Sequence, residues 1–138
     1  MSLSPSQRLA SIDDLLLYRL GRLSSVAGAM VVRLCEGGYG ITRREWAVLA
    51  HLYENGSLPP SALAERMHRD RARTSRILTA LGLKQLVLRT IPANDRRSAL
   101  VSLTPAGRAL YEVLMPQIQA INGQILSALQ TEEIARFD

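Results

Sequence analysis

The chain has 138 residues, 47% of them hydrophobic and 4% aromatic, which suits a single domain and argues against aromatic platforms for single-stranded nucleic acid. Its formal net charge of +5 is local, because residues 66–97 hold nine Lys or Arg against two acidic residues, as expected for a binder of duplex DNA. A single cysteine excludes a disulfide framework. We expect neither a membrane span nor an export leader, and therefore a cytoplasmic protein without membrane contact.

The first predicted element is a long helix over about residues 6–36. Ser4 and Pro5 form a helix-entry signal, and Gly37 with Gly38 would end the helix. Between them, apolar residues recur at every third or fourth position. This stripe comprises Leu9, Ile12, Leu16, Leu20, Leu23, Met30, Val31 and Leu34. It is longer than one small domain can cover, so we expect a partner helix.

Three shorter helices are predicted next. Thr42 and Glu45 form a capping box that opens the first of them. The second spans residues 59–67, with two prolines at its start. After a tight turn, Asp70 can cap a longer helix that extends to about Lys84. Two helices joined in this way, the second rich in arginine, are typical of a helix-turn-helix.

A β-hairpin and a last helix complete the pattern. Residues 86–91 and 98–103 are rich in β-branched and aliphatic residues, and a turn-forming segment joins them, so we expect a wing. Thr104 with Pro105 opens a helix that Pro116 should bend. Thr131, Glu132 and Glu133 resemble a further helix start close to Asp138, so we expect the natural protein to be longer. The fold class is therefore mainly α with a small β-hairpin wing.

The arginine-rich helix has two unlike faces. At 100° per residue, its apolar side faces the core through Thr74, Ile77, Leu78 and Leu81. The predicted DNA-contacting residues of this helix and the preceding turn are small or basic, namely Arg69, Arg71, Ala72, Arg73, Ser75, Arg76 and Thr79. Arg can bind guanine or phosphate, and Ser or Thr can bind either. A merely solvated face is disfavoured, because exposed helices usually mix both signs of charge.

The wing tip carries a second candidate DNA contact. Arg96 and Arg97 suit the minor groove, whose narrow segments attract guanidinium groups. A carboxylate facing phosphate would be repelled, so Asp95 is interpreted as a group that positions an arginine or caps the hairpin.

Several segments together resemble the MarR family of bacterial regulators. They are Thr42-x-x-Glu45-Trp46-x-Val48-Leu49, the run from Ser61 to Met67, Asp70-Arg71, Thr74-Ser75-Arg76, Leu86-Val87 and, most specific, the run from Asp95 to Gly107. The resemblance implies a winged-helix homodimer in which residues 6–36 and 106–138 form the dimerisation helices and residues 42–104 the DNA-binding lobe. It also implies that Arg97 is the wing arginine, supported by Asp95. Gln85 replaces the usual glycine and is expected to adopt φ > 0, while Gly82 replaces a better helix former.

The resemblance further implies a small anionic aromatic ligand in a crevice between the dimer helices and the DNA-binding lobe. The candidate lining residues are Tyr18, Arg22, Tyr39, Trp46 and His51. An arginine beside aromatic rings suits a carboxylate or phenolate, although packing or surface roles are equally open for each residue.

The sequence favours other functions less than DNA binding. Cys35 is a candidate redox sensor, but Glu36 should raise the pKa of its thiol, and an unreactive interface cysteine is the favoured interpretation. His51 and Glu54 have metal-compatible spacing without a third ligand, so we expect no metal or other cofactor. No catalytic constellation is present, which excludes the common enzyme motifs. A winged-helix module that binds protein rather than DNA remains the second alternative.

Overall fold

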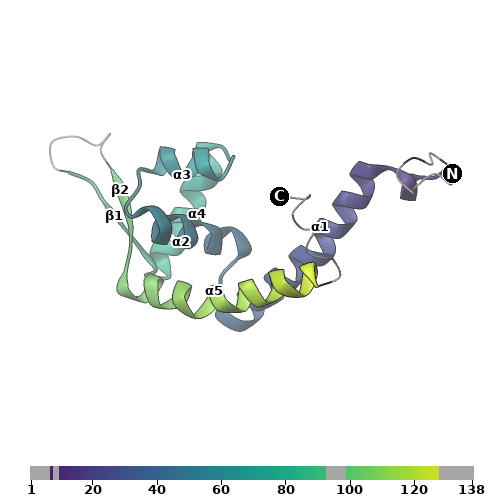
Figure 1. Ribbon diagram of the computed structural model, residues 1–138. Coiled ribbons are helices and arrows are strands. Elements are labelled where there is room, and N and C mark those ends of the chain that lie inside the picture. The colour runs from purple at the N-terminus through teal and green to yellow at the C-terminus, as the bar shows by residue number, and fades with distance from the viewer. Residues whose placement is uncertain (1–6, 8–9, 93–98, 128–138) are drawn as a thin grey trace.

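The computed structural model describes residue 7 and residues 10–92 and 99–127. In these residues, five α-helices and one antiparallel hairpin are arranged as a lobe with a projecting arm (Figure 1). Helices α2, α3 and α4 form the lobe with the hairpin at its side, α5 runs beneath them, and α1 extends away. The fold class expected from the sequence is confirmed.

The first helix is shorter than its apolar stripe predicts. α1 spans Leu16–Val32 and is preceded by a short 3-10 turn, Ile12–Asp14. Ser11 and Asp14 form a capping box around that turn, and Leu15 then adopts an extended conformation at ψ 126°. The extended residues Ser11 and Leu15 therefore interrupt the helix that the Ser4–Pro5 signal and the apolar stripe predict from about residue 6. At its other end α1 passes into a π-helical turn, Arg33–Gly38.

The core of the lobe lies between α2 (Arg43–Asn55), α3 (Pro60–Arg66) and α4 (Arg71–Leu83). The capping box predicted at the start of α2 is confirmed. The Glu45 backbone N–H donates to Thr42 Oγ1 at 3.0 Å, and the Thr42 N–H donates to Glu45 Oε1 at 2.9 Å. The largest fully buried aliphatic side chains are Ile41, Val48, Leu49, Leu52, Leu63, Leu81, Val101 and Leu114. Helices and hairpin thus share one hydrophobic core.

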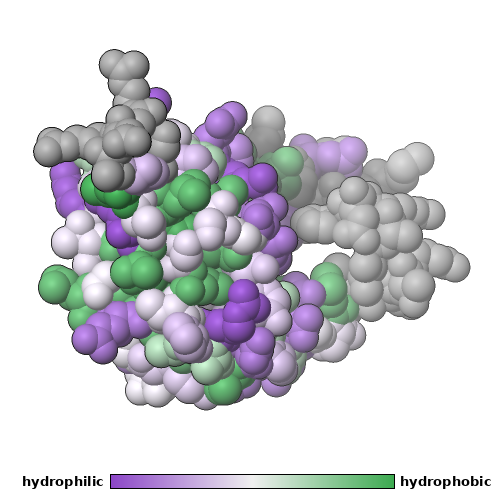
Figure 2. All heavy atoms as spheres, turned by 90° about the vertical axis from the view of Figure 1, so that its left-hand side faces the viewer, coloured by the Kyte–Doolittle hydropathy of each residue, from purple (hydrophilic) through white to green (hydrophobic). Residues whose placement is uncertain are grey.

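The hairpin pairs β1 (Val87–Thr90) with β2 (Leu100–Leu103), with Val87 opposite Leu103 and Thr90 opposite Leu100. Val87 and Val101 are buried. Leu88, Ile91 and Leu100 are exposed, and Figure 2 shows hydrophobic and hydrophilic side chains intermingled on this side of the molecule. The hairpin is therefore anchored by its inner residues and projects from the lobe. Its tip, with Asp95, Arg96 and Arg97, lies outside the described residues.

The start of α5 (Pro105–Leu126) is fastened to the turn between α4 and β1. The Thr104 hydroxyl donates to the Gln85 carbonyl at 2.7 Å and accepts the Gly107 N–H at 3.0 Å. Gln85 has φ 59°, which confirms the left-handed conformation expected there. A Cβ at position 107 would collide with the Leu86 carbonyl oxygen, so only glycine fits. The helix then continues through Pro116, and the predicted start at Thr131 lies outside the described residues. Every helix in the described ranges is too short or too polar to cross a bilayer.

Cys35 is a core residue rather than part of an open surface. Its side chain is fully buried beside the hydrophobic core of the lobe. Burial, and secondarily the carboxylate of Glu36, raise the pKa of the thiol above its ordinary value. The reactive thiolate is therefore disfavoured at neutral pH, which argues against the redox-sensing alternative.

Gly107→Ala should lower the free energy of unfolding by about 1–3 kcal/mol, because the added methyl group has to displace backbone at Leu86. Gly82→Ala is the matched control. Gly82 is exposed in α4 with open space around its Cα, so alanine there should raise the free energy of unfolding by about 0.5–1 kcal/mol. Urea titrations followed by circular dichroism, at one protein concentration, measure both changes. An unchanged midpoint for Gly107→Ala would show that the α5 start is not tightly packed.

Candidate nucleic-acid interface

The start of α4 is fixed by Asp70. Its carboxylate accepts the Arg73 N–H at 2.7 Å and lies 3.4 Å from the Arg73 Nε. The Thr74 hydroxyl donates to the Asp70 carbonyl at 3.0 Å and is buried. Asp, with its short acceptor side chain, is a strong N-cap, so the sequence defines where this helix begins.

The outward face of α4 has small residues along its centre. Thr74, Leu78 and Leu81 are buried against the lobe, as the helical period predicts. Ala72 and Thr79 are exposed on the opposite side, and the Thr79 hydroxyl donates to the Ser75 carbonyl at 2.9 Å. Short side chains at the centre allow the helix to approach base edges in a major groove closely.

Basic residues lie on both flanks of that centre. Arg69, Arg73 and Arg76 line one cavity together with Arg44 of α2. Arg71 and Ser75 line a groove on the other flank, which is shared with residues of α3 and with Arg89 of β1. The predicted DNA-contacting residues of α4 therefore divide into two groups. Sequence periodicity did not identify Arg44 or Arg89, because packing of other elements brings them beside α4.

The turn before α4 contains a second left-handed residue, His68, with φ 51°. The Arg69 N–H donates to the Ala64 carbonyl at 3.0 Å, which closes the turn. Glycine or asparagine usually occupies such a position, so the left-handed conformation of His68 was not predicted from the sequence. His68 is exposed and Arg69 half-buried beside α4.

An ion pair holds the far end of α4 against α2. Lys84 Nζ lies 2.8 Å from Glu45 Oε1 and 3.0 Å from Oε2, and it also donates to the Gly40 carbonyl at 2.9 Å. The Glu45 carboxylate is buried, whereas Lys84 is partly exposed. Breaking a pair of this kind leaves a buried charge without a partner, which is costly. The pair therefore fixes the orientation of α4 relative to the start of α2.

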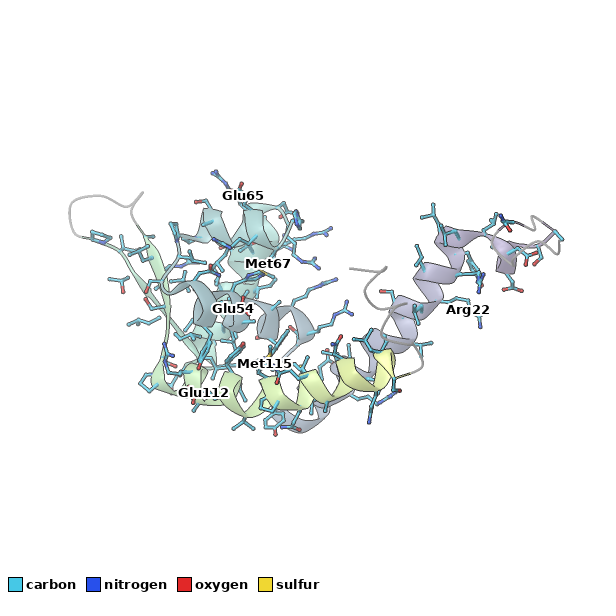
Figure 3. All side chains as sticks on the ribbon, viewed as in Figure 1. Arg22, Glu54, Glu65, Met67, Glu112 and Met115 are labelled. Carbon is cyan, nitrogen blue, oxygen red and sulfur yellow. The ribbon has the colours of Figure 1, made fainter. Side chains whose placement is uncertain are left out.

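The five ligand candidates do not meet within one chain. Tyr18 and Arg22 line a shallow groove on α1, and Figure 3 shows Arg22 well away from the lobe. Tyr39 instead accepts a hydrogen bond from Gln117 of α5 at 2.7 Å. The ring of Trp46 on α2 stacks with the ring of Tyr111 on α5, with 6.4 Å between the ring centroids. His51 is half-buried on α2.

The indole ring of Trp46 has one buried polar atom without a partner. Among the described residues, the Trp46 Nε1–H is the one buried side-chain polar group without a hydrogen-bond partner. Burial, followed by the charges of Glu54 and Tyr53, raises the pKa of the neighbouring Tyr111, so its hydroxyl stays protonated at neutral pH. The described residues contain no cluster of His, Cys, Asp and Glu that could hold a metal.

Comparison with known proteins agrees with this geometry. Residues 41–99 match the model of the MarR family. The Homoprotocatechuate degradative operon repressor of Escherichia coli is 33% identical over 99 residues, which are 72% of this chain and 67% of that protein.

Solved structures share the fold over most of the chain. A probable transcriptional regulator from Pseudomonas aeruginosa is 30% identical with a TM-score of 0.80, over 92% of this chain and 94% of that one. The S. aureus MepR–DNA complex is 24% identical with a TM-score of 0.81, over 88% of this chain and 90% of that one, which supports the fold alone. The chain therefore belongs to the MarR family and is a winged-helix transcriptional repressor rather than an enzyme.

Proposed function

We propose that this repressor binds a pseudo-palindromic duplex operator as a homodimer, with one α4 helix in the major groove of each half-site. The outward face of α4 carries the proposal, since it places small residues between two arginine-bearing flanks. The Asp70 cap and the Lys84–Glu45 pair hold the helix at both ends. MepR, which has the same fold, has been solved as a complex with DNA. A repressor of this type acts on the chromosome and hence in the cytoplasm.

The wing supplies the second proposed contact. β1 and β2 project beside the groove formed by Arg71, Ser75 and Arg89. We propose that Arg96 and Arg97 lie at the minor groove, with Asp95 as a positioning carboxylate. Guanidinium groups there respond to groove width and phosphate potential rather than to base identity.

The apolar face of α1 supports the homodimer. At the C-terminal end of the stripe, Val31 and Leu34 pack against the core of the lobe. At the other end, Leu16, Leu20 and Leu23 are 57%, 47% and 58% exposed, and no residue of α1 is buried. An apolar stripe left open over several turns usually marks an interface. We propose that α1, together with α5, is covered by the same helices of a second copy.

We further propose that a small anionic aromatic compound modulates DNA binding. The unpaired Trp46 N–H could donate to a carboxylate or phenolate, which would remove the cost of leaving it buried without a partner. Arg22 of α1 pairs only weakly with Asp13, at 3.5 Å, and both side chains are exposed. Homoprotocatechuate, whose degradative operon the Escherichia coli relative represses, is itself an aromatic carboxylic acid.

The homodimer predicts a specific response to charge on α1. Leu20→Glu should shift the protein from dimer towards monomer at micromolar concentration, because it places a carboxylate in the apolar stripe. Ser25→Glu adds the same charge on the opposite face of α1 and should shift the equilibrium less. Light scattering measures both. A monomeric mass for the wild type would contradict the proposed assembly.

α4 and the wing should contribute differently to the free energy of DNA binding. Arg76→Ala should weaken operator binding by about 1–3 kcal/mol and narrow its preference over random DNA. Arg97→Ala should weaken binding to both DNAs more evenly and reduce the slope of log K against log salt by about one unit for each lost contact. Fluorescence titrations at several salt concentrations separate the two. If both variants bind duplex DNA like the wild type, the protein-interaction alternative replaces the DNA-binding proposal.

Ligand binding predicts a thermal shift. An aromatic carboxylic acid or phenol at about 100 times its Kd should stabilise the dimer by about 2.7 kcal/mol, which raises Tm by several degrees. It should also change operator affinity. Trp46→Phe keeps the ring but removes the N–H, so it should reduce the shift, whereas Tyr18→Phe tests the α1 groove separately. No change in Tm or affinity with any such compound would contradict the ligand proposal.

A further inference from the structure

Four arginines from separate parts of the chain meet beside α4. Arg44 is the second residue of α2, Arg69 lies in the turn before α4, and Arg73 and Arg76 lie on α4 itself. All four line one cavity of about 230 Å³, with Ile77 as its apolar member. The cavity lies on one flank of the face proposed to enter the major groove.

Few negative charges neutralise this group. Asp70 pairs with Arg73 at 3.4 Å, but both side chains are more than half exposed, so water screens the pair strongly. Within the described part of the chain, no ion pair is formed by Arg44, Arg69 or Arg76. The cavity therefore holds more cationic groups than its own carboxylates balance.

The nearest buried carboxylate is already occupied. Glu45 follows Arg44 in sequence, but its two oxygens accept hydrogen bonds from Lys84 Nζ, and Oε1 also accepts the Thr42 N–H. Glu36 lies in an adjoining cavity that Arg44 and Arg76 also line, and it is not among the residues of the four-arginine cavity. The positive end of the α2 dipole adds to the potential at Arg44.

We propose that this cavity is a seat for one phosphate-class oxyanion, supplied by the DNA backbone beside the major groove. Planar guanidinium groups from several directions match the oxygens of a phosphodiester. Residues of α4 contact that DNA strand from one direction only, whereas Arg44 contacts it from α2. The second contact therefore fixes the angle at which α4 enters the major groove. The inference rests on the proposed function, and it adds Arg44 to the DNA-contacting residues.

Arg43 offers a matched control. It precedes Arg44 on α2 and carries the same charge, but its guanidinium lies against α1, where a Cβ at Gly28 would be 2.5 Å from its Nη1. Arg43 lines the adjoining cavity and not the four-arginine cavity. Replacing either residue changes the net charge equally, so a difference between them reports the seat rather than the overall field.

The test is binding of the full-length dimer to a mixed-sequence duplex from about 50 to 200 mM salt. Arg44→Ala should weaken binding about tenfold and lower the magnitude of the log K against log salt slope by about two, one contact per protomer. Arg44→Lys should keep most of the slope, and Arg43→Ala should change it little. Equal effects of Arg43→Ala and Arg44→Ala would overturn the seat while leaving DNA binding intact. A wild type without salt-dependent duplex binding would instead overturn the proposed function.

Two further measurements identify the source of the oxyanion. If Arg44 and Arg73 hold one phosphate, the double alanine variant should lose less than the sum of the single losses, whereas additive losses would argue against a shared phosphate. Thermal shifts with inorganic phosphate test a free anion. A phosphate-dependent rise in Tm that Arg44→Ala abolishes, with unchanged DNA binding, would overturn the DNA-backbone assignment. Circular dichroism of Arg44→Ala should match that of the wild type, because Arg44 is exposed.

Discussion

The contact of Lys84 with Glu45 and Gly40 is the interaction on which the proposed DNA-binding surface depends. It joins the end of α4, the start of α2 and the turn that leads from α1. Because the carboxylate is buried, its charge requires this partner. The Lys84 contact thus sets the orientation of α4 relative to the turn that connects the lobe to the α1 arm. A displacement of that turn has to carry α4 with it or break the ion pair.

Features that depend on neighbouring residues could be predicted from the sequence. The Thr42–Glu45 box, the Asp70 cap and the start of α5 each require only a few consecutive residues, and the structure places all three as expected. The predicted start of the first helix, at about residue 6, was wrong. The Ser4–Pro5 signal and the apolar stripe predict one helix from about residue 6, but Leu15 is extended, so α1 begins only at Leu16.

Features that depend on packing could not be predicted in this way. Lys84 and Glu45 are 39 residues apart, so their pairing follows only once α2 and α4 share a core. Arg44 likewise joins Arg69, Arg73 and Arg76 through the packing of separate helices. The ligand candidates illustrate the converse. The family resemblance placed them in one crevice, but Tyr18 and Arg22 line a groove on α1, which extends away from the lobe that holds Trp46 and His51 on α2.

The concentration of arginine around α4 also has an energetic consequence. Like charges on one helix and the adjoining turn repel one another, and the exposed Asp70 pair relieves little of that repulsion. The burial of Thr74, Leu78 and Leu81 has to hold the helix against it. DNA phosphates would remove the repulsion as they bind, so part of the cost of placing these charges together is recovered only in the complex. A surface of this kind is poorly suited to a neutral protein partner. Its excess of positive charge favours duplex DNA over the protein-interaction alternative.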